Sequence, residues 1–477
     1  MLDRAHLKHL HFLGIAGTGM GTVAAMFREI GLQVTGSDQA VYPPMSDFLR
    51  ERGIVFHEGY AEKNLTPKPD LAIVGNALSR GNPELEAVLT HRIPFVSLPE
   101  LLRGWFLYRS RNLVVTGTHG KTTTSTMLTF LLEKGGLQPS WFIGGVPVDL
   151  PGGCHHGQGP FWVLEGDEYD TSFADKRSKF LHYLPELVIL NNVEFDHADI
   201  YPDIAAIQKS FRQLLNVVPK NGLALINADD PRAIEVAKDA PCEILEVGAG
   251  PQAAARYHIL QQTPSGSVFT LHGQKFHLGL AGQHNVHNAS MAISAAHTLG
   301  LSLDKLATIL PEFRGVRRRL EVRAEAGGIT LVDDFGHHPS ALRESIAALR
   351  SRYPGRRLWA LFEPRSNTTR RGIFQKELAQ SLSAADGVYI AEIARKDQLD
   401  PQTRLNPQKM AEDIRKAGRE AFFLPGPEEI FKDLLPRLKS GDVVAVFTNG
   451  SFGGLVQKMS EALSVRGGQS SNRTLKT

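Results

Sequence analysis

A glycine-rich loop that ends in lysine and threonine is the clearest chemical signal in the sequence. It reads Thr116-Gly-Thr-His-Gly-Lys-Thr-Thr123 and lies between an expected strand and an expected helix. Gly117 and Gly120 would let backbone amides turn toward phosphate oxygens at the helix N-terminus. Lys121 would reach the terminal phosphates of a nucleotide, and the Thr122 hydroxyl would hold Mg²⁺. The loop predicts a nucleoside-triphosphate site rather than a turn with an exposed lysine, although valine stands where the usual G-x-x-x-x-G-K-S/T spacing has its first glycine.

A second glycine-rich turn lies near the N-terminus and reads Gly14-Ile-Ala-Gly-Thr-Gly-Met-Gly21. It is similar to a dinucleotide-binding fingerprint, and Asp38 lies about where a ribose-binding acid would be. The strict G-x-G-x-x-G register from Gly17 requires glycine at position 22, where the chain has Thr22. The turn therefore holds a phosphate or diphosphate of some nucleotide, or it is a tight turn without a ligand, and NAD is not indicated.

Two polar segments follow expected strands and could hold a metal ion. They read Leu164-Glu-Gly-Asp-Glu-Tyr-Asp170 and Asn191-Asn-Val-Glu-Phe-Asp-His197. The carboxyl ends of parallel strands face the ligand crevice of an α/β sheet, and Mg²⁺ can share carboxylate ligands with phosphates there. Glu165 is favoured over the three acids after it because it follows the strand directly, and His197 could bind metal or phosphate. The alternatives are a solvated acidic loop and a structural histidine.

Two later motifs carry amides, imidazoles and carboxylates. Gly282-Gln-His-Asn-Val-His-Asn288 opens an expected helix, and Asp333-Asp-Phe-Gly-His-His-Pro339 ends an expected strand. Amides suit an adenine edge and a carboxylate suits ribose hydroxyls, but both motifs taken alone are also typical of caps and turns. The pairs His155-His156 and His337-His338 lack the partners of a sequence-local zinc motif, so no zinc is predicted.

The alternation of apolar strands with helical stretches indicates parallel sheets that carry helices on their faces. We expect three consecutive α/β domains, namely a Rossmann-like N-terminal domain, a central P-loop ATPase domain and a Rossmann-like C-terminal domain. Their expected limits, with a linker over 108–112 and a disordered tail, are 1–109, 110–320, 321–463 and 464–477. The strands expected to position the motifs lie at 9–16, 32–36, 71–74, 94–96, 113–115, 161–164, 187–190, 223–226, 330–332, 358–362, 387–390 and 443–447.

Composition limits the function classes. A length of 477 residues suggests roughly three domains. The 53 basic and 50 acidic residues leave a net charge of +3, which predicts neither a nucleic-acid partner nor a membrane surface. Cys154 and Cys242 are too few for a disulfide framework or a four-cysteine zinc site. Without a long apolar run or a signal peptide, the protein is expected to be cytoplasmic, and its oligomeric state is left open.

Taken in order, these segments resemble the Mur ligase superfamily of ATP-dependent amide-bond-forming enzymes in peptidoglycan metabolism. The resemblance covers roughly residues 9 to 455 and rests on the phosphate loop and on the motifs at 282–288 and 333–339. The N-terminal turn, followed by Gly36-Ser-Asp38, is similar to the branch that binds UDP-N-acetylmuramate. That branch accounts for a fingerprint that is close to a dinucleotide site without being one.

Within that branch, two nucleophiles compete. Enzymes that add L-alanine typically have serine where this chain has Tyr169, and the stretch Thr171–Phe180 is similar to enzymes that attach L-Ala-γ-D-Glu-meso-diaminopimelate during murein recycling. Three further segments share that similarity: 191–199, 362–368 and 449–454. Gly166 and Phe335 replace the usual alanine and tyrosine without removing a charged group. Addition of L-alanine remains the alternative, and a nicotinamide-dependent oxidoreductase or an NTP-driven regulatory protein are alternatives from other classes.

The resemblance also implies a mechanism and a set of site residues. The lactyl carboxylate would attack the γ-phosphate of ATP, and the peptide amine would displace phosphate from the acyl phosphate. The implied catalytic residues are Lys121, Glu165 and His197, with two Mg²⁺ ions at Thr122 and at Glu165 with His197. The implied ATP-binding residues are Gly117, Thr118, His119, Gly120, Lys121, Thr122, Thr123, His284, Asn285, Asn288 and Asp334. The implied substrate-binding residues are Gly17, Thr18, Gly19, Met20, Ser37, Asp38, Arg177 and Asn192. Lys209 is the nearest candidate for a carbamylated lysine and is expected to be unmodified.

Overall fold

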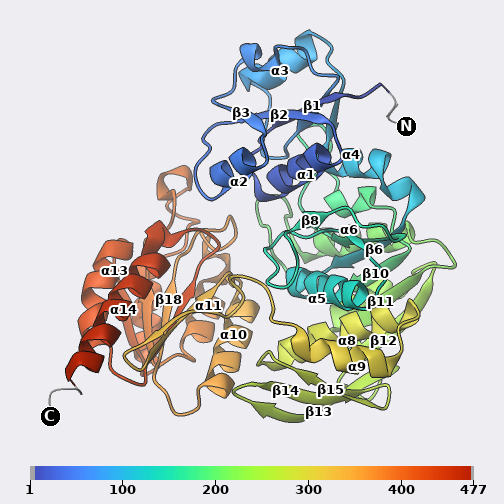
Figure 1. The fold of residues 1–477 in the computed structure, drawn as a ribbon. Helices are drawn as coiled ribbons and strands as arrows, with labels where there is room; N and C mark the ends of the chain where they lie inside the picture. Colours follow the sequence, from blue (N-terminus) through green and yellow to red (C-terminus); the bar gives the residue numbers. More distant parts are fainter. Residues whose placement is uncertain (1–5, 474–477) are drawn as a thin grey trace.

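Three sheets in chain order form the framework of the protein (Figure 1). The computed structural model describes residues 6–473. The sheets cover residues 9–97, 111–278 and 321–447, and helices pack on their faces. This arrangement confirms the expected succession of three α/β domains.

The N-terminal domain is a parallel sheet with strand order β3-β2-β1-β4-β5. Its central strands β1 and β4 are buried along their whole length, as expected for strands that carry helices on both faces. The strands are β1 (His9–Leu13), β2 (Gln33–Asp38), β3 (Val55–Glu58), β4 (Leu71–Val74) and β5 (Phe95–Ser97). The helices are α1 (Thr18–Glu29), α2 (Met45–Glu51), α3 (Pro83–Thr90) and α4 (Leu98–Trp105).

The central domain has a ten-stranded sheet with order β15-β14-β13-β12-β11-β10-β6-β9-β7-β8. Its strands are β6 (Arg111–Thr116), β7 (Ser140–Phe142), β8 (Cys154–His155), β9 (Phe161–Glu165), β10 (Leu187–Leu190), β11 (Leu223–Asn227), β12 (Glu243–Gly248), β13 (Ala255–Thr263), β14 (Gly266–Leu271) and β15 (Gln274–Leu278). Its helices are α5 (Lys121–Lys134), α6 (Ile204–Asn216), α7 (Pro231–Ala237), α8 (Gln283–Thr298) and α9 (Leu303–Ile309).

The order β10-β6-β9 decides where the site forms. These neighbouring strands run parallel, so the phosphate loop after β6 lies between the acidic segment after β9 and the Asn191–His197 segment after β10. Three motifs that are far apart in the sequence therefore meet at one sheet edge. Strands β13 to β15, which the sequence analysis did not predict, are antiparallel to one another and extend the sheet beyond β12.

The C-terminal domain has a six-stranded sheet with order β16-β17-β21-β18-β19-β20, in which only β16 is antiparallel. Its strands are β16 (Glu321–Ala326), β17 (Ile329–Asp334), β18 (Leu358–Phe362), β19 (Gly387–Ile390), β20 (Glu420–Phe423) and β21 (Val443–Phe447). Its helices are α10 (Pro339–Arg352), α11 (Gln375–Leu382), α12 (Pro407–Lys416), α13 (Pro427–Leu434) and α14 (Leu455–Arg473).

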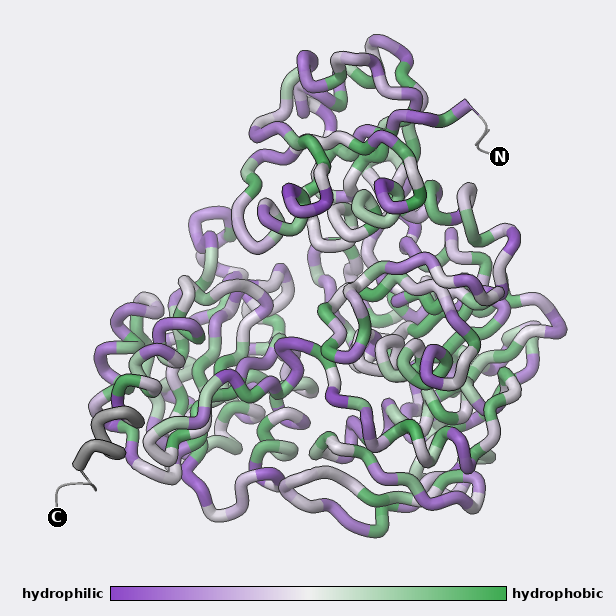
Figure 2. Tube along the Cα trace, in the orientation of Figure 1, coloured by the Kyte–Doolittle hydropathy of each residue, from purple (hydrophilic) through white to green (hydrophobic). Residues whose placement is uncertain are grey.

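The N-terminal and central domains share one hydrophobic cluster, whereas the C-terminal domain has clusters of its own. The shared cluster joins helix α1 to strand β9, and the rings of Phe106 and Trp162 pack across the boundary with centroids 5.0 Å apart. The buried members of the C-terminal clusters all come from residues 329–463. Apolar segments run through the interior of each domain in Figure 2.

Two expectations about segment boundaries need correction. Residues 108–112 are not a free linker, because Leu107–Arg109 form a 3-10 turn and β6 begins at Arg111, whose side chain pairs with Glu186. Helix α14 continues to Arg473 and so covers most of the segment expected to be disordered, since it extends a helix that is packed on the sheet at Leu463. The remainder of that segment, 474–477, lies outside the described residues.

Among residues 6–473, no helix combines the length and the apolar character needed to cross a membrane.

Candidate active site

The phosphate loop connects β6 to α5 and is held by the segment after β10. Gly117 and Gly120 have φ values of +125° and +79°, and helix α5 begins directly after Gly120. Asn192 holds the loop at two points: its carbonyl accepts from the Thr118 amide at 3.1 Å, and its Oδ1 accepts from the His119 amide at 2.7 Å. Asn192, expected to contact substrate, therefore also fixes the shape of the loop.

Gly120 has no room for a side chain. A Cβ there would lie 2.6 Å from Asn288 Oδ1 and 2.9 Å from Asn191 Nδ2. We expect Gly120→Ala to lower the free energy of unfolding by about 3 kcal/mol, because the left-handed backbone costs 1–2 kcal/mol and the clash adds to it. Nucleotide binding should weaken as the loop shifts. Chemical denaturation and calorimetric titration with ATP would measure the two effects.

Gly136 provides the matched control for this prediction. It follows the other end of α5 and has a similar φ of +83°, but nothing lies within 4 Å of a Cβ placed there. Gly136→Ala should cost only the backbone strain, about 1–2 kcal/mol, with unchanged nucleotide binding. Equal effects of the two substitutions would contradict a specific fit at Gly120.

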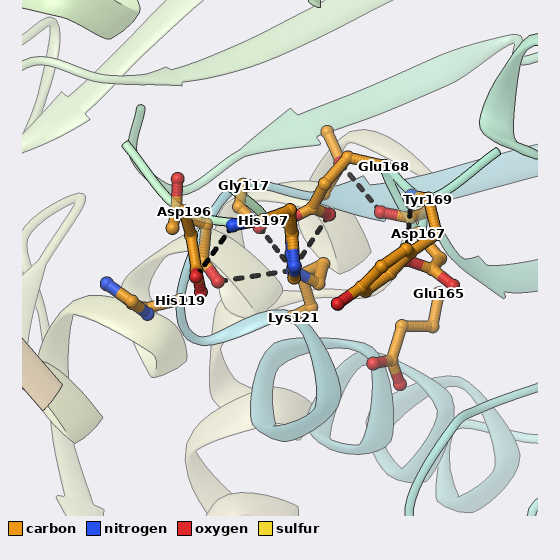
Figure 3. A network of polar contacts seen from close by, with 12 residues as sticks. Gly117, His119, Lys121, Glu165, Asp167, Glu168, Tyr169, Asp196 and His197 are labelled. Atoms are coloured by element: carbon orange, nitrogen blue, oxygen red, sulfur yellow. Dashed lines mark hydrogen bonds and ion pairs between the residues drawn. The ribbon is translucent and has the colours of Figure 1, made fainter. Parts of the chain in front are cut away.

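Lys121 lies at the centre of a buried network (Figure 3). Its ammonium donates to the carbonyls of Gly117 at 2.7 Å and Thr118 at 3.1 Å, and it pairs with Glu168 Oε2 at 2.9 Å. Glu168 Oε1 also contacts His197 Nε2 at 2.9 Å. The carboxylate of Glu168, which is 2% exposed, thus joins the lysine of the phosphate loop to the histidine after β10.

The opposite charges in this network offset the effect of burial on the pKa values of Lys121, Glu168 and His197. Burial alone would lower the pKa of Lys121, but Glu168 and its acidic neighbours raise it above the ordinary value. Burial would likewise raise the pKa of Glu168, and Lys121 and His197 hold it below its usual value. The pKa of His197 is raised because the carboxylate of Glu168 outweighs the effect of burial. The network therefore keeps both Lys121 and Glu168 charged although they are buried.

Glu165 and Thr122 form the part of the site that fits a divalent cation. The Thr122 hydroxyl donates to Glu165 Oε1 at 2.8 Å, and the Gly144 amide donates to Glu165 Oε2 at 2.7 Å. Burial raises the pKa of the Glu165 carboxyl despite these donors, so the group lacks a full counter-charge. A hydroxyl and an undercompensated carboxylate are hard oxygen ligands of the kind Mg²⁺ prefers.

The network differs from the expected pairing in one respect. Glu165 and His197 are expected to share a metal ion, and the structure adds a contact between His197 Nε2 and Glu168. The choice of Glu165 over Glu168 rested on its position directly after the strand. That position does not account for the turn after β9, which brings Glu168 back toward Lys121 (Figure 3).

A cleft of about 1250 Å³ connects these residues to all three domains. Twelve of the residues expected to bind ATP or to take part in catalysis line the cleft, and Gly117 does not. The expected residues in its lining are Gly17, Thr18, Gly19, Met20, Thr118, His119, Gly120, Lys121, Thr122, Thr123, Glu165, Asn192, His197, His284, Asn285, Asn288 and Asp334. The cleft can hold a nucleoside triphosphate at the loop and a second substrate beside the N-terminal turn.

The residues expected at the adenosine end are partly engaged in holding the fold. Asn288 Oδ1 accepts from the Thr124 hydroxyl at 3.1 Å, and Asn285 Nδ2 donates to the Ala281 carbonyl at 2.8 Å. Asp334 accepts from the Leu320 amide at 2.8 Å. Burial lowers the pKa of His284 to about 4, so its imidazole is neutral at pH 7. A neutral imidazole has one donor and one acceptor nitrogen and can form hydrogen bonds with a nucleobase.

Two residues expected near the uridine nucleotide are engaged inside the N-terminal domain. Ser37 is buried and its hydroxyl donates to Glu84 Oε1 at 2.6 Å. The Asp38 carboxylate accepts from the Ala16 amide at 2.9 Å and so stabilises the glycine-rich turn. Neither residue is in the lining of the cleft, whereas the stretch Gly17–Met20 is.

Arg177 does not reach the cleft, contrary to the expectation that it would contact the muramoyl group. Its guanidinium pairs with Asp175 at 2.7 Å, two residues away, and its side chain is 63% exposed. Lys179 lines the cleft instead and pairs with Asp167 at 2.7 Å, which helps to hold the pKa of Asp167 at about 2 against the effect of burial. Lys209 is exposed on α6 and is also absent from the lining.

Sequence reasoning missed several residues that line the cleft. Arg319 belongs to the basic stretch after α9 and lines the cleft. Burial raises the pKa of Glu165 and of Asp334, and the charge of Arg319 opposes that rise. For His284, burial lowers the pKa and the charge of Arg319 lowers it further. Asp229 and Asp230 follow β11, the strand beside β10. Their position directly after an expected strand was a usable signal, of the same kind that identified Glu165.

A triphosphate loop that opens into a cleft shared by three α/β domains defines a nucleotide-dependent enzyme. Three family domains match the chain: "Mur ligase family, catalytic domain" over residues 9–108, "Mur ligase middle domain" over 115–296, and "Mur ligase, glutamate ligase domain" over 318–450. The chain belongs to the Mur ligase family and is a ligase.

Relatives and a solved structure match almost the whole chain. A UDP-N-acetylmuramate–L-alanyl-γ-D-glutamyl-meso-2,6-diaminoheptandioate ligase of Escherichia coli is 42% identical over 95% of this chain and 98% of its own length. A UDP-N-acetylmuramate–L-alanine ligase of Methylococcus capsulatus is 33% identical over 96% of this chain and 97% of its own. The crystal structure of a murein peptide ligase from Psychrobacter arcticus has a TM-score of 0.72 at 33% identity and covers 96% of this chain and 98% of that one.

Proposed function

We propose that this ligase joins L-alanyl-γ-D-glutamyl-meso-diaminopimelate to UDP-N-acetylmuramate, with ATP as co-substrate, in murein recycling. The observation that carries the proposal is the single cleft that contains both the phosphate loop, from Thr118 to Thr123, and the glycine turn, Gly17–Met20. One cavity can therefore bring the γ-phosphate of ATP to the carboxylate of a UDP-linked sugar. The peptide is assigned from the 42% identical relative, whose name specifies it.

The chemistry requires a carboxylate to approach the negatively charged phosphates of ATP. In the proposed reaction the lactyl carboxylate attacks the γ-phosphorus, ADP leaves, and the amine of the peptide then displaces phosphate from the acyl phosphate to form the amide. Lys121 would exchange its contacts with the Gly117 and Thr118 carbonyls for β- and γ-phosphate oxygens. Mg²⁺ held by Thr122 and Glu165 would neutralise phosphate charge when bound.

The C-terminal domain would complete the site. Asp334 at the end of β17 and Arg319 before β16 both line the cleft, so the adenosine and phosphate regions are bounded by two domains. Closure of these groups over ATP would exclude water, which otherwise hydrolyses an acyl phosphate. We further propose the domain limits 1–109, 110–320 and 321–463. A cytoplasmic location follows from the use of ATP and a UDP-sugar.

A second Mg²⁺ ion near His197 is also part of the proposal. We expect His197→Ala to raise the Mg²⁺ concentration for half-maximal phosphate release by about ten-fold, as for the loss of a ligand or its supporting partner. A Mg²⁺ titration of steady-state phosphate release would measure this. His182 is a matched control, because it also contacts a carboxylate, Asp175, at 3.1 Å but does not line the cleft. An unchanged Mg²⁺ requirement in His197→Ala would leave His197 as a structural partner of Glu168.

The proposed function is tested by phosphate release from ATP with Mg²⁺ and UDP-N-acetylmuramate, comparing L-alanine with the tripeptide as the amine. Mass spectrometry of the product identifies the amide. We expect release and product with the tripeptide. A preference for free L-alanine would show that this chain instead has the activity named for the 33% identical relative. No amide with either amine would contradict both assignments.

A further inference from the structure

Two histidines and a glutamate from different domains converge beside the phosphate loop. His119 belongs to the loop itself, Glu194 lies after β10, and His338 precedes α10 of the C-terminal domain. The ligand atoms form a small triangle: His119 Nε2 lies 3.0 Å from His338 Nδ1 and 3.4 Å from Glu194 Oε2. The third side, from His338 Nδ1 to Glu194 Oε2, is 3.3 Å. Among residues 6–473, this is the one group of three or more His, Cys, Asp or Glu side chains placed to share a metal ion.

The triangle has the dimensions of a metal site. Zinc binds imidazole nitrogen and carboxylate oxygen at about 2.0–2.2 Å in a tetrahedron, which places any two ligand atoms about 3.3 Å apart. The three measured sides, 3.0, 3.4 and 3.3 Å, match that edge length. Two imidazoles and one carboxylate are also a ligand set that borderline divalent metals bind while a fourth position stays open.

His338 presents a lone pair to this triangle, and in the metal-free form His119 Nε2 donates to it at 3.0 Å, so a metal would displace the proton of His119 Nε2. His338 Nε2 lies 3.2 Å from the Phe195 carbonyl, which can only accept, so Nε2 carries the proton and Nδ1 faces Glu194 without one. Burial lowers the pKa of His338 to about 3, which keeps the imidazole neutral. This hydrogen bond to a backbone carbonyl is the kind of support that orients metal-bound histidines.

Glu194 is held in place from both sides. The Ser340 hydroxyl donates to Glu194 Oε2 at 2.6 Å, and the Glu194 amide donates to the Thr118 hydroxyl at 2.8 Å. Burial would raise the pKa of Glu194, but contacts with His119, Ser340 and His338 lower it to about 2, so the group is a carboxylate at neutral pH. The side chains of Glu194 and His338 are thus oriented by neighbouring groups and are in the protonation state that a metal requires.

We propose that His119, Glu194 and His338 form a binding site for one divalent ion of the Zn²⁺ class, separate from the Mg²⁺ ligands Thr122 and Glu165. The ion would connect the phosphate loop to the C-terminal domain, because His119 and His338 come from different domains. Its binding fixes the side chain of His119 and the start of α10 relative to each other. A bound ion would restrict movement of the C-terminal domain relative to the phosphate loop. It should therefore slow ligation when Mg²⁺ is already saturating.

The test uses the full-length, untagged protein freed of metals by chelation, with Co²⁺ as a spectroscopic probe for Zn²⁺. Four-coordinate Co²⁺ has intense visible absorption that six-coordinate aqueous Co²⁺ lacks. We expect one Co²⁺ ion per chain to develop this absorption and one equivalent of Zn²⁺ to abolish it. In His338→Gln and Glu194→Gln, the affinity for Co²⁺ should fall at least about ten-fold. Circular dichroism of each variant verifies folding, and either variant alone is sufficient for the test.

His91→Gln is the matched control. His91 contacts Glu62 at 2.7 Å, but that pair has no second histidine, so its loss should leave the Co²⁺ spectrum unchanged. Absence of the absorption in the unmodified protein would overturn the proposal. So would wild-type Co²⁺ affinity in a folded His338→Gln or Glu194→Gln variant. These outcomes are independent of the peptide substrate, because the readout is metal binding and not ligation.

Discussion

Lys121→Ala is expected to reduce phosphate release in the complete ligation assay by at least about a thousand-fold, or roughly 4 kcal/mol of transition-state stabilisation. The ammonium is buried at the start of α5, lies in the cleft, and can move from two backbone carbonyls to phosphate oxygens. Lys121 is the only lysine or arginine of the loop Thr116–Thr123. Binding of UDP-N-acetylmuramate should be nearly unchanged, because the N-terminal turn lies on another domain. Steady-state kinetics and calorimetric titration would measure the two quantities.

Lys134→Ala is the matched control for this prediction. Lys134 lies at the other end of α5 and forms an exposed pair with Glu312 at 2.8 Å. An exposed ion pair contributes little, so the substitution should change stability by less than about 1 kcal/mol and leave turnover intact. Substantial turnover by Lys121→Ala would remove the phosphate loop from the mechanism.

Glu168→Gln is expected to have the second largest effect. It removes the carboxylate that contacts both Lys121 and His197 and leaves a buried ammonium with less compensation. We expect the free energy of unfolding to fall by about 3 kcal/mol, at the lower end of values for a broken buried pair because two carbonyls still accept from Lys121. The pKa of His197 should fall, since burial is then opposed by Asp196 but no longer by Glu168. Chemical denaturation and NMR titration of the His197 ring would measure both changes.

Asp170→Asn tests whether any acid of this segment would have the same effect. Asp170 pairs with Lys176 at 2.6 Å, and the Lys176 side chain is 69% exposed. The expected change in stability is within about 0.5 kcal/mol, with no change in the pKa of His197. If Glu168→Gln left the pKa of His197 unchanged, the proposed coupling between the two groups would be wrong.

Local sequence patterns were sufficient to predict elements whose conformation depends on residues close together in the chain. The phosphate loop was predictable because Gly117, Gly120, Lys121 and Thr122 act within one strand–loop–helix unit. The strands around it were predictable from their buried apolar runs. The hairpin between β14 and β15 had one usable signal in the sequence, Gly273, which lies in a two-residue turn with His272 where both residues have positive φ.

The parts of the site that could not be predicted depend on distant contacts. The contacts of Glu168 with Lys121 and His197 depend on how the chain turns after β9 and on the position of His197 after β10. Arg177 was expected in the cleft from the family resemblance, but a neighbouring partner, Asp175, holds its guanidinium at the surface. The pair His337-His338 lacked zinc partners in the sequence, and the partners of His338 come from another domain, more than 140 residues away along the chain.

The shared hydrophobic cluster of the N-terminal and central domains has a consequence for how the protein melts. Phe106 and Trp162 belong to one continuous core, so neither domain can unfold without exposing apolar surface of the other. The C-terminal domain has its own clusters and contacts the phosphate-loop region through polar groups such as Ser340 and Glu194. Calorimetry should therefore resolve two cooperative units rather than three. A destabilising change in the N-terminal core would weaken ATP binding as well, whereas damage to the C-terminal core would leave the N-terminal and central domains folded.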